Sequence, residues 1–249
     1  MIIDNPRAEH LIALRRLWQQ AFGDSDAFLD EFFEKGFAFD RCRCVFREGE
    51  PVAAVYRFDG AWQERKIAYL YALSVAESHR GQGLSRLLLA DTHAALRQMG
   101  FAGVVLEPAT QSLREYYSRL GYREFGSRQE RKIRSSAEPV SVAELGLLGY
   151  EQARKKLLPQ NGICQAGALT EFLQTQAVLW GGDGFVAAVS RQSPVVLEFL
   201  GDTQKLPGLL RTWQLPQAKV RLVGEENTAM YLSFSGESEK PTYFGLPMD

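Results

Sequence analysis

The first half of the chain alternates between segments with helical spacing of apolar residues and shorter, strand-like apolar runs. In residues 8–22 the apolar positions lie three or four apart, which predicts a helix. A second helix is predicted over 24–34, with Asp24 or Ser25 as its cap. Three strands are predicted to follow, over 42–47, 52–59 and 66–75.

The strand at 66–75 begins a strand–helix–strand unit. Residues 84–99 show helical spacing of apolar positions, and Gly100 supplies the stop. The apolar run 102–106 follows at once. Because such a crossover connects parallel neighbours, the unit predicts a parallel pair within an otherwise antiparallel sheet.

A short basic, glycine-rich loop joins this strand to its helix. Two glycines two residues apart allow the backbone to bend closely, so that successive N–H groups can point into one concavity. The helix that follows adds its positive N-terminal end. The loop therefore predicts an anion site suited to phosphate, made by Arg80, Gly81, Gln82, Gly83, Leu84, Ser85 and Arg86.

Taken alone, this loop also fits an ordinary glycine-rich turn. A P-loop is excluded because no Lys-Ser or Lys-Thr follows the second glycine, and the three-glycine fingerprint of a dinucleotide fold is missing. The loop resembles the pyrophosphate-binding loop of the GNAT superfamily of N-acetyltransferases, in which Arg80, Gly83 and Ser85 occupy the three pattern positions. Ser85 stands where that family usually has Gly or Ala.

A second resemblance to the GNAT superfamily follows the next strand. There the family has a short capped helix with a Tyr four residues before a Gly-Phe or Gly-Tyr pair, and Tyr117 and Gly121-Tyr122 match it. Thr110 stands at the place of the usual capping Asn, and its hydroxyl can also cap. The resemblance implies that Tyr117 protonates the departing thiolate of a thioester; the alternative is a buried packing aromatic. Tyr116, about 100° away around the helix, is the second choice.

With these two signatures, the chain resembles the family over about residues 1–133. The implied fold class is α/β (α+β), a GNAT fold with a mixed sheet and splayed central strands. Acetyl-CoA is implied as the cosubstrate in the gap between those strands. Its contacts would come from the loop above and from Leu73, Ser74, Val75, Thr110 and Tyr117.

The polar stretch 134–141 is predicted to be a linker, and 142–249 a second module. This module contains predicted helices over 142–158 and 206–213 and predicted strands over 177–180, 184–191, 194–200, 219–223 and 230–234. Their order repeats that of the first half, so the pattern predicts a degenerate GNAT-like module.

The counterpart of the glycine-rich loop in this second module lacks Arg-Gly-x-Gly, so the module should not bind coenzyme A. The tandem resembles the first two domains of the enhanced-intracellular-survival type of acetyltransferases. We expect the second module to wall the acceptor pocket of the first. Trp180, Phe185 and Trp213 are predicted to serve its core and the contact between the halves.

The resemblance implies an acetyl-CoA-dependent N-acetyltransferase, in which a primary amine of a small molecule or peptide attacks the thioester directly. A base is needed to take the ammonium proton, and the candidates are Glu107 and Glu77, although either also fits a solvated strand-end carboxylate. Tyr71 is a third candidate for lining the amine pocket. The alternative function is a non-catalytic acyl-CoA-binding or sensing module whose second half recruits a partner.

The composition limits the classes of binding partner that we expect. The 249 residues include 29 Lys and Arg against 30 Asp and Glu, a net charge of -1, so neither nucleic acid nor an anionic membrane is expected as a partner. No apolar stretch of about 18 residues occurs, and we expect a cytoplasmic protein. The three cysteines predict reduced thiols, and the histidines show no metal-ligand spacing, so no metal is expected. Homo-oligomer formation is left open.

Overall fold

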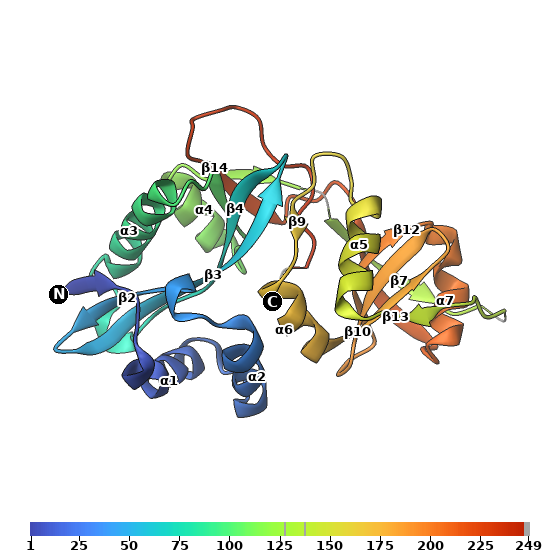
Figure 1. Ribbon diagram of the computed structural model, residues 1–249, viewed down its shortest axis with the longest axis horizontal. Helices are drawn as coiled ribbons and strands as arrows, with labels where there is room; N and C mark the ends of the chain where they lie inside the picture. The colour runs from blue at the N-terminus through green and yellow to red at the C-terminus, as the bar shows by residue number, and fades with distance from the viewer. Residues whose placement is uncertain (127, 137, 247–249) are drawn as a thin grey trace.

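The computed structural model describes residues 1–126, 128–136 and 138–246, whose strands form two sheets. Figure 1 shows the two sheets next to each other along the longest axis of the molecule, with the N-terminus at the outer end of the first. The predicted fold class, α/β with mixed sheets, is confirmed. Residue 137 of the predicted linker and residues 247–249 of the predicted second module lie outside the described residues.

The first sheet has eight strands and is mostly antiparallel. Its longest ladder joins β3 and β4, which correspond to the second and third predicted strands. Across the sheet the order is β1 (Ile2–Asp4), β2 (Cys42–Arg47), β3 (Glu50–Trp62), β4 (Arg65–Val75), β5 (Gly103–Leu106), β14 (Ala229–Ser233) and β6 (Arg123–Phe125), with β9 (Cys164–Gln165) beside β3.

Helices cover both faces of this sheet. They are α1 (Leu11–Phe22) and α2 (Asp26–Glu31) on one face, and α3 (Leu84–Gln98) and α4 (Gln111–Arg119) on the other. Because successive strand residues point to opposite faces, β4 contributes Tyr71 to the core under α1 and Leu70 to the core under α3. The two faces of the first sheet therefore carry separate apolar cores.

The two central parallel strands diverge after a short contact. β4 pairs with β5 only from Ile67↔Gly103 to Tyr69↔Val105, although β4 continues to Val75. At Ala72 the backbone takes a left-handed conformation, with φ of 49°, and the register with β3 shifts there. This bulge bends the strand and increases its twist. The predicted splay of the central strands is confirmed.

The second sheet has six strands and repeats the crossover without the divergence. Its order is β7 (Arg128–Arg134), β13 (Gln217–Val223), β12 (Val195–Gly201), β11 (Phe185–Ser190), β10 (Ala177–Gly182) and β8 (Ala143–Glu144), with α5 (Leu147–Leu157), α6 (Ala168–Gln176) and α7 (Leu206–Thr212) around it. The parallel strands β12 and β13 remain paired as far as Phe199↔Leu222.

The sheets do not follow the predicted boundaries of 1–133 and 142–249. β7, placed by the sequence in the first domain, pairs with β13 in the second sheet. β14, placed in the second domain, lies between β5 and β6 of the first sheet. We correct the division accordingly: each sheet takes one strand from the other half of the chain, because strand partners are set by long-range packing that local patterns do not encode.

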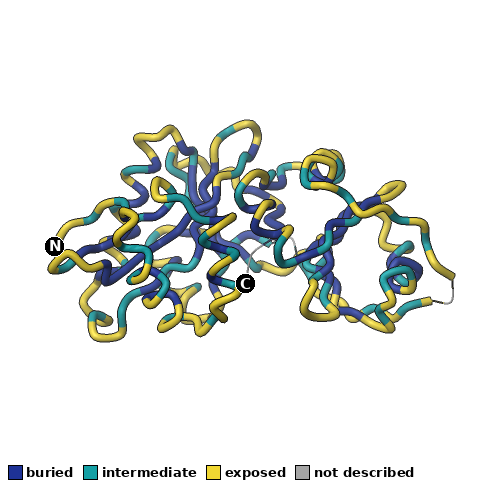
Figure 2. The backbone as a smooth tube through the Cα atoms, turned by 60° about the horizontal axis from the view of Figure 1, so that its bottom comes forward, coloured by how far each residue is buried: buried dark blue, intermediate teal, exposed yellow. Residues whose placement is uncertain are grey.

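The contact between the halves is aromatic, but it uses other residues than those predicted. Phe172 of α6 packs against Phe28 and Phe32, at ring-centroid distances of 5.3 and 5.4 Å. Phe244 packs on Tyr69 at 4.8 Å. Figure 2 shows the buried backbone inside both sheets, with exposed loops outside. Of the residues predicted to serve both the core and this contact, Phe185 lies in the core of the second sheet, and the partly buried Trp180 and Trp213 pack against that core, so the core part of the prediction is confirmed.

A buried ion pair anchors the C-terminal segment to the second sheet. Arg154 Nε lies 2.6 Å from Glu198 Oε2, and both side chains are 1% exposed. Tyr150 and Tyr243 donate their hydroxyls to the Glu198 carboxylate at 3.1 and 2.8 Å. Because an unpaired buried charge is strongly unfavourable, removing one partner would destabilise the protein more than the pair itself stabilises it.

The strand exchange predicts that neither half folds alone. A fragment of residues 1–133 lacks β14, which leaves the facing edges of β5 and β6 without their partner. We expect this fragment to be aggregated or unfolded by circular dichroism and size-exclusion chromatography. A soluble fragment with cooperative thermal unfolding would contradict the exchange.

A point variant tests the same strand within the whole chain. Met230 of β14 is fully buried in the core under α3. Met230→Ala should lower the free energy of unfolding by about 2–5 kcal/mol in urea denaturation, because a cavity replaces the side chain. Glu225→Ala, an exposed position shortly before β14, should change it by less than about 0.5 kcal/mol.

Candidate active site

The glycine-rich loop adopts the conformation that its sequence predicts. A short 3-10 turn (Glu77–His79) follows β4, and Gly81 and Gly83 have φ of 76° and 74°. These left-handed conformations favour glycine. A Cβ added at either glycine would meet no atom within 4 Å, so the space beside the loop is open.

The first turn of α3 supplies the donors. Gly83 is the N-cap residue, and the first helical hydrogen bond runs from Leu87 N to Gly83 O at 3.1 Å. The N–H groups of Leu84, Ser85 and Arg86 precede that bond and have no carbonyl to bond inside the helix. Together with the positive helix end, they make the loop a site for an anionic group.

Basic side chains surround this loop. Arg80 is exposed, and its Nε donates to Val75 O at 3.3 Å, which holds its stem beside the end of β4. Gln82 reaches back to Ser78 O at 3.4 Å, and Arg86 is exposed on the first turn of α3. The charges of Arg80 and Arg86 are therefore available to a ligand at the loop.

Ser85 has a defined role in this structure. Its hydroxyl lies 3.0 Å from the Tyr116 hydroxyl, which ties the first turn of α3 to α4. Tyr116 is therefore bonded to the first turn of α3, and it is not among the residues that line the cavity described below. Tyr116, the second choice as the acid, thus has a different position from Tyr117, which does line that cavity, although the two rings lie 5.2 Å apart.

Helix α4 places Tyr117. The Thr110 hydroxyl accepts the Leu113 N–H at 3.3 Å, which confirms the predicted cap. Tyr117 is 7% exposed, and its ring packs on Tyr122 at 5.4 Å. Burial, with a smaller contribution from Tyr116, raises the pKa of Tyr117 well above its ordinary value. Its hydroxyl is therefore protonated throughout the neutral range.

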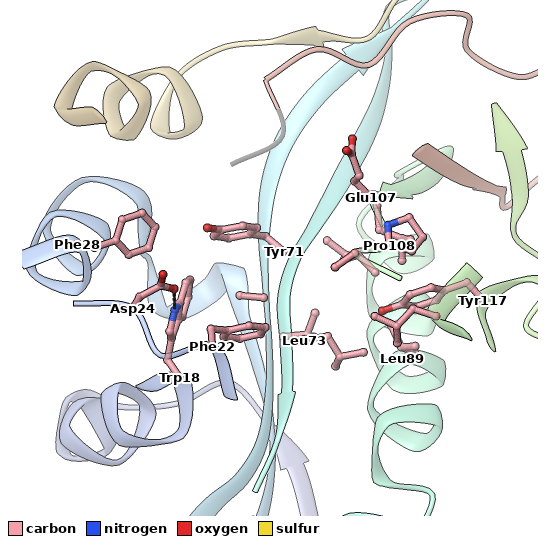
Figure 3. Close-up of a pocket in the computed structure, with 16 residues that line it drawn as sticks. Trp18, Phe22, Asp24, Phe28, Tyr71, Leu73, Leu89, Glu107, Pro108 and Tyr117 are labelled. Atoms are coloured by element: carbon pink, nitrogen blue, oxygen red, sulfur yellow. Dashed lines mark hydrogen bonds between the residues drawn. The ribbon is translucent and has the colours of Figure 1, made fainter. Parts of the chain in front are cut away.

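A cavity of about 340 Å³ lies where β4 and β5 diverge. Figure 3 shows two groups of side chains on opposite sides of β4. One side is lined by Trp18, Phe22, Asp24, Phe28 and Tyr71, and the other by Leu89, Glu107, Pro108 and Tyr117, with Leu73 of β4 between them. The cavity thus connects the two faces of the sheet through the gap between the strands.

The predicted base candidates lie in different places. Glu107 follows β5, lines the cavity and forms an ion pair with Arg128 of β7. Glu77 is exposed in the 3-10 turn and does not line the cavity, because that turn carries it beyond the end of β4. The structure therefore brings Glu107, Tyr71 and Leu73 together with Tyr117, but not Glu77.

Sequence reasoning missed three features of this site. Trp18 was expected only as an apolar helix residue, and Asp24 only as one of two candidate helix caps. The other candidate, Ser25, is the cap, since its hydroxyl accepts the Phe28 N–H at 3.2 Å, while Asp24 lines the cavity. Arg128 could not be placed because its strand pairs across the two halves. No local sequence signal marks any of these contacts.

Within 1–126, 128–136 and 138–246, no group of three or more His, Cys, Asp or Glu side chains is arranged to hold a metal ion. In the same part of the chain, no helix has both the length and the apolar character needed to span a membrane.

Comparison with known proteins agrees with this geometry. Residues 3–125 match the family model described as the acetyltransferase (GNAT) domain. No curated protein matches the chain.

Solved structures share the fold of the whole chain. A GCN5-related N-acetyltransferase from Kribbella flavida is 16% identical with a TM-score of 0.72, covering 92% of this chain and 70% of its own. Eis1 from Mycobacterium abscessus is 12% identical with a TM-score of 0.69, covering 94% and 74%. A putative acetyltransferase from Pyrococcus horikoshii is 15% identical with a TM-score of 0.71, covering 98% and 93%. At these identities the similarity concerns the fold.

Proposed function

The first half of this chain is a GNAT acetyltransferase domain, and from that premise we propose that the protein transfers an acetyl group from acetyl-CoA to a primary amine. The observation that carries the proposal is the cavity at the divergence of β4 and β5. It joins a face that bears an anion loop and a buried phenol to a face that is open to a second substrate.

Coenzyme binding is assigned to the α3 face. The N–H groups at the start of α3, with Arg80 and Arg86, would hold the pyrophosphate. The edge of β4 that turns away from β5 would pair through the backbone of Leu73 and Val75 with the amide groups of the pantetheine arm. Ser74, Thr110 and the loop glycines complete the contacts that we propose.

The bulge in β4 is the proposed binding place of the reacting carbonyl group. The left-handed Ala72 interrupts the regular alternation of the strand next to Leu73, where both residues line the cavity. Backbone N–H groups at this point would stabilise the oxyanion that forms when the amine attacks the thioester. Such donors are fixed by the strand before the reaction begins.

Tyr117 is assigned as the general acid. The amine nitrogen bonds to the carbonyl carbon, the C–S bond breaks, and the Tyr117 hydroxyl gives its proton to the departing sulfur. Burial raises the pKa of Tyr117, and burial of the thiolate in the same cavity would raise the pKa of its conjugate thiol as well. The shared environment therefore keeps donor and acceptor matched.

Glu107 is the proposed route for the ammonium proton. It lines the cavity, whereas Glu77 does not, and Arg128 fixes the position of its carboxylate. We propose that the proton leaves the amine for Glu107 through a water molecule. The described residues that line the cavity lie between positions 18 and 117, so the second half does not wall the cavity as the sequence led us to expect. We propose that the second half supports the site from behind, through the packing of Phe172 against Phe28.

A turnover assay distinguishes the proposed acetyltransferase from the non-catalytic alternative. Ser85 and Thr110 differ from the usual residues of the family, and these two differences favour a module that only binds acyl-CoA. Release of free thiol from acetyl-CoA, measured with a panel of amines, polyamines, aminoglycosides and peptides, would exclude that alternative. Coenzyme A binding without amine-dependent thiol release would favour it.

Arg80→Ala should weaken coenzyme binding. Loss of a charge-assisted contact to the pyrophosphate is worth about 1.5–3 kcal/mol, or about 10- to 150-fold in Kd by calorimetry. Arg119→Ala removes an exposed arginine at the far end of α4 and should leave Kd unchanged. Equal affinity of the Arg80 variant and the unmodified protein would place the pyrophosphate elsewhere.

Tyr117→Phe should reduce turnover by about 10²- to 10⁴-fold, because it removes the acidic hydroxyl and keeps the ring packing. Tyr122→Phe is the matched control, since its hydroxyl pairs with His93 Nε2 at 2.7 Å and does not line the cavity. The control should retain most of its turnover. Single-turnover kinetics that show the same rate in both variants would remove Tyr117 from the mechanism.

A further inference from the structure

The α1 side of the cavity holds a carboxylate in a fixed orientation. Trp18 Nε1 donates to Asp24 Oδ2 at 2.7 Å, and the bond is drawn in Figure 3. Trp18 is 1% exposed, so its indole cannot move without disturbing the core. One carboxylate oxygen of Asp24 is thereby occupied by a neutral donor, which brings no compensating positive charge.

Two helix ends fix the position of Asp24. Gly23 ends α1 with φ of 74°, and its N–H donates to Gln19 O at 2.9 Å. Ser25 caps α2 directly afterwards. Asp24 therefore lies on a short, well-defined connection. The carbonyl end of α1 beside it adds a negative potential that favours a cation.

The two carboxylates of the cavity differ in their compensation. Glu107 is paired with the guanidinium of Arg128. Asp24, among the residues that the structure describes, forms no ion pair with a Lys, Arg or His side chain within 4.0 Å. Asp24 thus offers its charge to a ligand, whereas that of Glu107 is largely neutralised.

Aromatic rings line the cavity around the indole that binds this carboxylate. Trp18 lies 5.7 Å from Phe22, 6.3 Å from Phe28 and 5.5 Å from Tyr71, measured between ring centroids, and all four side chains line the cavity. Aromatic faces attract alkylammonium groups and also pack against methylene chains. A carboxylate among such rings is suited to an ammonium group on an apolar chain.

That ammonium group is not the nucleophile. The reacting nitrogen must lose its proton and approach the thioester near Tyr117, on the other side of β4 from Asp24 (Figure 3). Asp24 does the opposite, because a nearby carboxylate stabilises the protonated form of an amine. An alkylamine, with a pKa of about 10.4 like that of Lys, stays charged at this position.

We infer that the acceptor is a diamine with an apolar spacer, in which one nitrogen is acetylated beside Tyr117 and the other remains protonated at Asp24. This inference rests on the proposed acetyl transfer and adds the class of the acceptor. The aromatic side chains hold the spacer, and Asp24 with the end of α1 holds the distal charge. Recognition of the second nitrogen orients the first toward the thioester.

The test compares cadaverine with n-pentylamine, which has the same carbon chain but only one nitrogen. The unmodified protein should acetylate cadaverine with a kcat/KM about 10- to 100-fold higher, expressed mainly in KM. Asp24→Asn keeps an oxygen for the Trp18 N–H and removes only the charge, so this ratio should fall to about 1–3. Asp26→Asn removes a charge two residues away, outside the cavity, and should preserve the ratio.

Equal kcat/KM for the two amines in the unmodified protein would overturn the inference and leave the acetyltransferase proposal intact. A ratio that survives Asp24→Asn would equally overturn it. If no amine is acetylated, the proposed function fails, and calorimetric titration of the two amines into the protein with coenzyme A still decides the inference. Tighter binding of cadaverine that depends on Asp24 supports the diamine site, and equal binding refutes it.

Discussion

The site depends on one interruption of hydrogen bonding, the end of the β4–β5 ladder at Tyr69↔Val105. A buried backbone N–H or C=O without a partner costs about 1–3 kcal/mol, so a sheet does not open at its centre without compensation. Here β4 continues to Val75 along the open gap. A ligand that pairs like a strand would satisfy these groups, and the loop at the end of β4 would hold the anionic part of that ligand.

The second sheet shows what the same topology does without this interruption. β12 and β13 remain paired as far as Phe199↔Leu222, and apolar side chains of α7 close the core above them. The exchange of β7 and β14 makes the two sheets interdependent, and the Arg154–Glu198 pair fixes the segment that ends near Tyr69. The second half is thereby suited to stabilising the first.

Local patterns predicted the parts of this protein that local physics determines. The strand–loop–helix unit, the Thr110 cap and the strands β2 to β5 and β10 to β14 follow from periodicity and from glycines with positive φ. Helix α6 and the strand β7 were missed, and β14 was assigned to the wrong sheet, because these depend on contacts between distant segments. Asp24 was considered only as an alternative to the Ser25 cap for the same reason: only the folded chain brings it into the cavity.

Three carboxylates near the gap illustrate how position decides chemistry. Glu77 is left in solvent by the turn after β4, Glu107 is held by Arg128, and Asp24 is held by a neutral indole. Identical functional groups thus differ in access, in compensating charge and in freedom to move. In the proposed reaction, the carboxylate paired with a guanidinium would be fixed in place beside the reacting nitrogen, while the one bonded to an indole would offer its charge to a cation. A single cavity would then take a proton from one nitrogen of the acceptor and hold the other as an ammonium group.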